Sequence, residues 1–160
     1  MKIKEYLRKE SGFTLVELLV VIVIIGILAV GVLAAVNPIE QIRRGRDTST
    51  QAAAREVMSA AERYYGVHEA YPSAWTSGST QSVDSTAVSP LITRKELREN
   101  FDQRSAVANG KLYYYIDSTT EEIRVCFEPE SDAIGENASC SSPTDCSSGS
   151  TYFCVPDSAD

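Results

Sequence analysis

The hydrophobic residues of this chain are concentrated in one run near the N-terminus. The 19 residues from Leu18 to Val36 contain no charged side chain. A helix rises about 1.5 Å per residue, so this run spans roughly 28 Å, the thickness of a bilayer's hydrocarbon core. Because the run has no polar face, it predicts a helix that lies in lipid or in a protein bundle.

Polar residues return after Pro38, and the pattern becomes amphipathic. Pro38 lacks an N–H and crowds the carbonyl of Ala34, so a kink or an unwound stretch is expected there. Gly26 and Gly31 permit close helix approach or weaken the helix locally. Residues 38–71 continue as an amphipathic helix that lays one stripe on a globular head. The expected stripe is Ile42, Ser49, Ala53, Val57, Ala60, Tyr64 and Val67.

The last third of the chain has the two-residue period of β-strands. Apolar side chains alternate over 111–117 and over 122–128, and the four-residue link between them predicts a hairpin. Residues 151–155 predict a third strand. The pattern therefore indicates an α+β fold, in which a long N-terminal helix packs its second half on a small antiparallel sheet within segment 111–160.

The segment between helix and sheet has the composition of a surface loop. It begins at Pro72, which ends the helix, and residues 72–110 contain many Ser and Thr. Thr93 and Glu96 have the spacing of a capping box and predict a short helix over 94–100.

Charge is distributed unevenly along the chain. Residues 1–12 hold four bases against two acids, and the positive-inside rule keeps them in the cytoplasm while the rest crosses outward. From Asp117 to the end, one base faces ten acids. This end would repel nucleic acid phosphates, so no direct nucleic acid binding is expected.

All four cysteines, Cys126, Cys140, Cys146 and Cys154, lie in the last 35 residues. An even count in a loop-rich segment beyond a membrane span predicts two disulfides in an oxidising compartment. Four cysteines allow three pairings, of which we favour Cys126–Cys154 with Cys140–Cys146. Zinc is disfavoured because there is no CxxC spacing and the one histidine, His68, is far upstream. No metal or cofactor is predicted.

Glu17 is a lone carboxylate at the edge of the apolar run. Such a group costs free energy unless a partner meets it, which makes it a functional candidate. Residues 12–19 read Gly-Phe-Thr-Leu-Val-Glu-Leu-Leu. With the apolar run that follows to Ala29 and the basic leader before it, this motif resembles the class III signal of type IV pilins and pseudopilins. The resemblance covers residues 8–36, and the rest of the chain is similar in topology only.

The resemblance implies a role for each motif position. A prepilin peptidase would cut between Gly12 and Phe13, and Phe13 would then be N-methylated. Glu17 would pair with the new terminal amine of a neighbouring subunit during assembly. Each charge alone would be costly in an apolar bundle, so the pair would select the register between subunits.

Three segments follow from this organisation. Residues 1–12 would be the leader, 13–37 the transmembrane and assembly half of the helix, and 38–160 the head. The precursor would be a single-pass protein of the inner or cytoplasmic membrane, and the mature chain would enter an extracellular pilus. Its partners would be membrane lipid, the peptidase, the assembly machinery and other copies in a helical filament.

The function implied is that of a pilus subunit serving adhesion, motility or DNA uptake. One alternative is a pseudopilin or minor pilin of a type II secretion or competence system, although major pseudopilins often end in a calcium-binding loop without disulfides. An ordinary secretory signal fits poorly, because Glu17 opens the apolar run and the run is long.

A membrane-anchored binding or enzymatic domain is the alternative of another class. His68 could act as a base, but the sequence has no Gly-rich phosphate loop and no nucleophile elbow, so the chain is predicted not to be an enzyme. Trp75 and Tyr71 could contact sugars or partners, or could cover the helix–sheet core. Asn137 begins an Asn-Ala-Ser triplet, a candidate glycosylation site.

Overall fold

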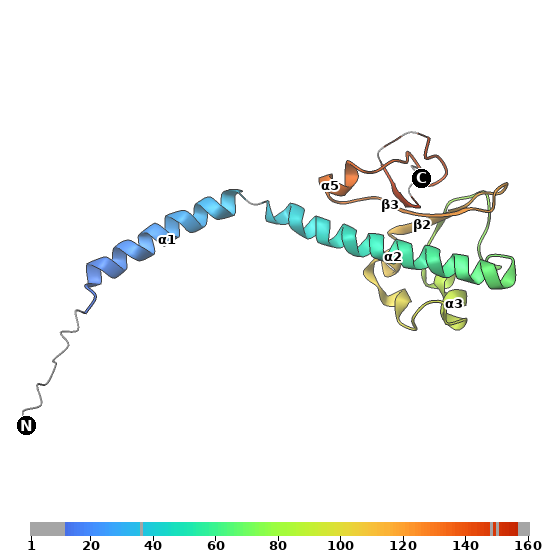
Figure 1. Cartoon of the computed structure of the whole chain (residues 1–160), viewed down its shortest axis with the longest axis horizontal. Helices are drawn as coiled ribbons and strands as arrows, with labels where there is room; N and C mark the ends of the chain where they lie inside the picture. The colour runs from blue at the N-terminus through green and yellow to red at the C-terminus, as the bar shows by residue number, and fades with distance from the viewer. Residues whose placement is uncertain (1–11, 36, 148, 150, 157–160) are drawn as a thin grey trace, which may run out of the picture. The chain divides into compact units, whose positions relative to one another are not determined.

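The structure is a computed structural model that describes residues 12–35, 37–147, 149 and 151–156. The chain divides into two compact units, Met1–Pro38 and Ile39–Asp160, each of which is described by itself (Figure 1). The basic leader predicted at 1–12 lies outside the described residues except for Gly12, and so does Val36 at the end of the apolar run.

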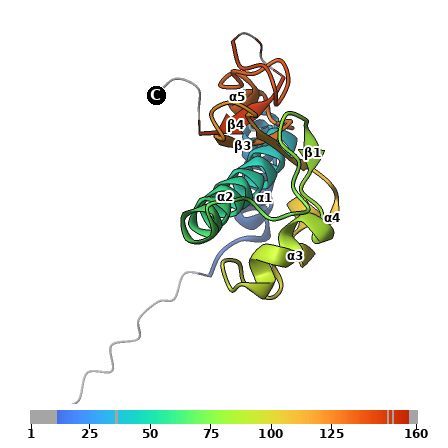
Figure 2. The same ribbon diagram turned by 90° about the vertical axis from the view of Figure 1, so that its right-hand side faces the viewer.

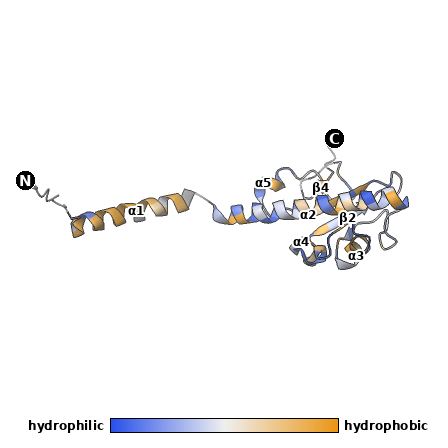
Figure 3. Cartoon of the chain, turned by 60° about the horizontal axis from the view of Figure 1, so that its bottom comes forward, coloured by the Kyte–Doolittle hydropathy of each residue, from blue (hydrophilic) through white to orange (hydrophobic). Residues whose placement is uncertain are grey.

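The first unit contains one helix, α1 (Leu15–Ala35). Its segment Leu15–Leu33 is long and apolar enough to cross a membrane, and none of that segment is buried within the chain. Colouring by hydropathy shows apolar residues all round this helix (Figure 3). The sequence therefore predicts the apolar helix correctly, and no described residue of the chain buries it.

The helix is interrupted beside Pro38 and not at the two glycines. Gly26 and Gly31, where the sequence allows a local weakening or break, leave α1 continuous. A helical glycine costs about 1 kcal/mol relative to alanine, and the hydrogen-bonded turns on both sides tolerate that. α1 ends at Ala35 and the next helix begins at Pro38. Proline suits a first helical position because the N–H it lacks would have no partner there.

The second unit is built on α2 (Pro38–His68), a helix of 31 residues. The buried stripe differs from the predicted one near both helix ends, where Ile42 is 58% exposed and Val67 is 73% exposed. Burial depends on which part of the helix the rest of the head covers, and the covered part carries mostly small side chains. The buried residues of α2 are Asp47, Thr50, Ala53, Ala54, Val57, Ala60 and Ala61.

A four-stranded antiparallel sheet has the order β1-β2-β3-β4. The central strands, β2 (Leu112–Ile116) and β3 (Ile123–Phe127), form the predicted hairpin with Leu112 opposite Phe127. The edge strands are β1 (Gln81–Ser82) and β4 (Phe153–Val155). Alternate side chains of β2 are buried, as the two-residue period predicts.

The segment predicted to be a loop contains three short helices. They are α3 (Ser85–Thr93), the 3₁₀ helix η1 (Phe101–Gln103) and α4 (Ser105–Ala108). The short helix expected over 94–100 is wrong, because Asp84 caps α3 by accepting a 2.9 Å hydrogen bond from the N–H of Ala87, and Thr93 ends that helix. The Ser- and Thr-rich composition obscured a short apolar stripe, Ala87, Val88 and Leu91, which is buried.

One hydrophobic core joins α2, α3 and the sheet. The strands and α5 (Asp132–Gly135) lie on one side of α2, and α3 lies on the other (Figures 1 and 2). Trp75 is only 8% exposed, stacks on Tyr114 with ring centroids 4.4 Å apart, and donates its Nε1–H to the carbonyl of Ala87. Trp75 therefore covers the core and does not present its ring as a binding surface.

Candidate functional site

The start of α1 is closed by a reciprocal pair of hydrogen bonds between Thr14 and Glu17. The Thr14 N–H and the Thr14 hydroxyl both donate to Oε2 of Glu17 at 2.8 Å, and the Glu17 N–H donates to Oγ1 of Thr14 at 3.2 Å. This arrangement is a capping box, which satisfies N–H groups that no helical carbonyl can reach. No role was predicted for Thr14 from the sequence, although Thr14 and Glu17 have the Thr-x-x-Glu spacing that signals this box.

The capping box leaves one oxygen of Glu17 open. Both bonds from Thr14 go to Oε2, and among the described residues no donor contacts Oε1. The carboxylate also stands at the positive end of the helix macrodipole, which favours its charged form. Glu17 is thus oriented by its own helix while it keeps one acceptor for another molecule.

The three described residues before α1 are exposed and lie outside the helix. Gly12, Phe13 and Thr14 precede the first helical residue, and the Phe13 side chain is 85% exposed. An added Cβ at Gly12 would meet no atom within 4 Å. The Gly12–Phe13 peptide bond therefore lies between two exposed residues, where an enzyme can reach it.

The apolar residues of α1 are exposed along the whole helix. The large side chains from Leu15 to Leu33 have exposed fractions between 47% and 81%. A soluble monomer rarely exposes a contiguous apolar surface of this size, so the surface indicates a membrane or a protein partner. The site therefore consists of an accessible peptide bond, an oriented carboxylate and a helix that needs external cover.

Comparison with known protein families matches this same region. The family described as the prokaryotic N-terminal methylation motif matches residues 7–33. The chain carries the class III signal of type IV pilins and pseudopilins. This pilin-type signal covers the start of the chain, and the head of the pilin-like fold lies beyond it. Searches of curated proteins and of solved structures found no match.

The four cysteines form two disulfides, Cys126–Cys154 and Cys140–Cys146. Cys126 and Cys154 are direct partners in the register of β3 and β4, which brings their side chains to the same face of the sheet. Sulfur atoms of Cys140, Cys146 and Cys154 lie within 4.8 Å of one another. They are disulfide sulfurs, so this cluster offers no thiolate to a metal ion.

Two other residues singled out in the sequence lie on the surface of the head. His68 is the last residue of α2, is exposed, and has its ring centroid 4.4 Å from that of Tyr64. Asn137 is exposed and donates its side-chain amide to the carbonyl of Ala133 at 2.9 Å. Glycosylation of Asn137 stays a prediction.

Asp47 is a buried carboxylate that was not predicted from the sequence. It is 2% exposed and is the first buried residue of α2. Its oxygens accept bonds from the Glu130 N–H, the Ser131 N–H and the Ser131 hydroxyl at 2.6–3.0 Å. Because both carboxylate oxygens accept hydrogen bonds from the segment after β3, Asp47 clamps that segment onto α2 and has a structural role.

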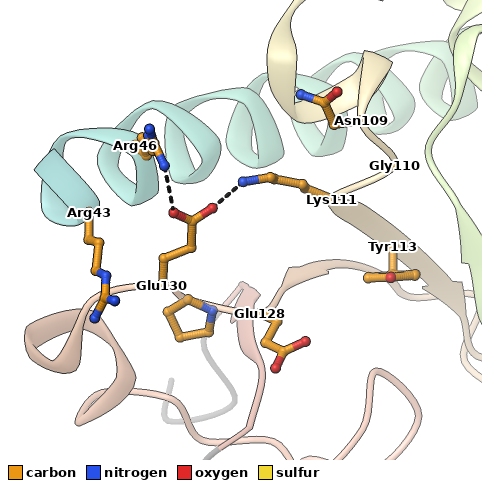
Figure 4. Close-up of a pocket in the computed structure, with 9 residues that line it drawn as sticks. Arg43, Arg46, Asn109, Gly110, Lys111, Tyr113, Glu128 and Glu130 are labelled. Atoms are coloured by element: carbon orange, nitrogen blue, oxygen red, sulfur yellow. Dashed lines mark hydrogen bonds and ion pairs between the residues drawn. The ribbon is translucent and has the colours of Figure 1, made fainter.

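An open polar groove of about 720 Å³ lies beside this clamp (Figure 4). The carboxylate of Glu130 lies between Arg46 of α2 and Lys111 before β2, and forms an ion pair with each. The Lys111 ammonium, followed by Arg46, lowers the pKa of Glu130. Arg43 also lines the groove, but no ion pair joins it to another described residue.

Proposed function

We propose that this chain is a structural subunit of a type IV pilus filament, made as a membrane-anchored precursor and processed by a prepilin peptidase. The observation that carries the proposal is the methylation motif at residues 7–33, which overlaps an apolar helix that no described residue of the chain covers. Proteins with this signal are structural, so the subunit itself needs no chemistry.

Processing would occur at the accessible bond between Gly12 and Phe13. Phe13 would become the first residue, would be N-methylated, and would keep a positive charge. Thr14 would then be the second residue, and its two bonds would continue to hold Oε2 of Glu17. The open Oε1 would accept from the terminal amine of a neighbouring copy, and the pairing of two otherwise costly charges would set the register.

The apolar helix would pass from one environment to another without exposure to water. Before assembly its 19-residue span would lie in the bilayer. In the filament the same side chains would pack against those of other copies. The head, closed by its own core and two disulfides, would form the outer wall, and the disulfides support a pilin more than a pseudopilin.

The decisive measurement is the N-terminal residue of the assembled protein. Filaments sheared from cells should contain this chain, and its mass should be that of residues 13–160 with one added methyl group and two disulfides. A chain that begins at Met1 and stays a monomer in the membrane would refute the proposal. Abundance in the sheared fraction separates a major pilin, which dominates it, from a minor pilin or pseudopilin.

Two variants separate processing from assembly. Gly12→Arg should leave the uncleaved precursor and no filaments. Glu17→Ala should still be cleaved at Phe13 but should lose filaments. Glu99→Ala, which removes an exposed carboxylate from the head, is the matched control and should assemble normally. Normal filaments from Glu17→Ala would refute the pairing role.

A further inference from the structure

A small aromatic pocket opens at the C-terminal end of α2. It has a volume of about 220 Å³ and lies between that helix end and the β2–β3 turn. Tyr65 and Tyr71 form its walls, with ring centroids 4.9 Å apart. Glu69, Asp117 and Glu121 bring three carboxylates to its rim.

The pocket is strongly negative. Burial, followed by the charges of nearby carboxylates, raises the pKa of Tyr71 to about 12. The hydrogen bond to Glu121 is the first cause of the raised pKa of Tyr65, and Glu69 adds to it. Both phenols therefore stay neutral beside Glu69 and Glu121, neither of which has a salt bridge to a described lysine or arginine, and aromatic rings next to carboxylates attract a cation.

The two glutamates at the rim are held in place without a cation of their own. Glu69 and Glu121 have φ values of 54° and 59°, in the left-handed region that favours glycine. Tyr65 donates to the Glu121 carboxylate, and Tyr71 donates to the Glu121 carbonyl at 2.9 Å. Among the described residues, no lysine or arginine forms a salt bridge with either glutamate.

The opposite end of α2 carries the complementary charge. Arg43, Arg44 and Arg46 fall within four residues. Arg44 pairs with Glu40, and Arg46 pairs with Glu130. Arg43 has no ion pair among the described residues, so its guanidinium is available to another molecule.

We propose that the pocket lined by Tyr65, Tyr71, Glu69 and Glu121 binds Arg43 of a second copy of this chain. A guanidinium stacks on aromatic rings and pairs with carboxylates in a fixed geometry, so it suits both the walls and the rim. The contact joins unlike ends of two copies, and such a head-to-tail interface builds an open helical assembly when the rotation between copies does not close into a ring. This inference rests on the proposed filament.

The contact cannot form within one chain. Residues 43 and 68 belong to one continuous helix, and 25 helical residues span about 37 Å. Any direct link between position 43 and Glu69 or Glu121 must therefore join two copies. This length makes a zero-length cross-link a clean test.

The experiment uses Arg43→Lys in the full-length chain, because carbodiimide couples carboxylates to amines but not to guanidinium groups. Sheared filaments and membranes are treated with carbodiimide, digested and analysed by mass spectrometry. We expect a peptide that joins position 43 to Glu69 or Glu121. Arg55→Lys, an exposed position on the same helix, is the control and should give at least about tenfold less of any such peptide. Cross-links from Lys95 or Lys111 to these glutamates, with none from position 43, would overturn the proposal.

Charge-reversal variants test the same contact independently of the cross-link. Arg43→Glu and Glu69→Arg should each lower filament yield about tenfold, a factor within the range of interfacial charge pairs, and the double variant should restore most of it. A double variant no better than the singles would overturn the contact. Arg43→Lys filaments of normal yield, with methylated Phe13 but no cross-link, would refute this contact alone, whereas an unprocessed Arg43→Lys monomer without the cross-link would refute the filament as well.

Discussion

The two units of this chain place the same kinds of apolar side chain in opposite surroundings. In the head, Val57, Leu91, Leu112 and Val125 are fully buried. In α1, the leucines, isoleucines and valines are about half exposed or more. The head therefore satisfies its hydrophobic residues within the chain, whereas α1 leaves the same requirement to lipid or to other copies.

The carboxylates of the two units differ in the same way. Asp47 in the head uses both oxygens in bonds to Glu130 and Ser131. Glu17 in α1 uses only Oε2, which accepts from Thr14. The head therefore meets its buried carboxylate within the chain, whereas Glu17 keeps one oxygen that no described residue contacts.

The largest expected effect tests the two kinds of apolar residue directly. Phe127→Ala should destabilise the head by about 3–5 kcal/mol, because it leaves a cavity in a packed core. Ile25→Ala, in α1, should leave head stability unchanged. Denaturant unfolding in detergent, followed by fluorescence of Trp75, the only tryptophan, measures both. Equal losses in the free energy of unfolding of the two variants would show that α1 unfolds together with the head.

Removal of each disulfide should give the next largest effect and should rank by loop length. Cys126 and Cys154 are 28 residues apart, and Cys140 and Cys146 are 6 apart. On the chain-entropy model, replacing the first pair by serine should cost about 3–4 kcal/mol and the second about 2 kcal/mol. The same unfolding assay measures both, and a reversed ranking would contradict the entropic account.

Loss of the buried carboxylate clamp should have an effect between those of the two disulfides. Asp47→Ala leaves two backbone N–H groups and one hydroxyl without an acceptor, so we expect a loss of about 2–4 kcal/mol. Glu56→Ala removes a half-buried carboxylate that pairs with Arg104 at 2.7 Å, and should cost less than about 1 kcal/mol. Similar losses in the two variants would show that Asp47 does not clamp the head.

The smallest effect concerns pH. The Lys111 ammonium holds the folded-state pKa of Glu130 below its usual 4.5. The resulting stabilisation is present above pH 4.5 and is lost as pH falls through the lower folded-state value. Titration of Glu130 by NMR should therefore show a pKa that rises towards 4.5 in Lys111→Met. An unchanged pKa would assign the shift to Arg46 instead.

Local patterns explain why much of the fold was predictable. A helix with no polar face can be predicted by counting consecutive uncharged residues. The alternation of apolar and polar side chains within five residues is enough to predict β2 and β3. The helix around Ala87 was missed because its apolar stripe is short and lies among serines and threonines. The Thr14–Glu17 box was not predicted although its spacing is local, because Glu17 was assigned only to pairing with another molecule and not to its own helix.

The sequence by itself determined the signal, the apolar extent of α1 and the two-residue period of the hairpin, since each depends on residues close together in the chain. The tertiary structure alone decided which face of α2 is buried, that Asp47 meets Ser131, and which cysteines share a bond. Those features join segments up to 84 residues apart, and burial or pairing at such separations depends on how the whole head packs.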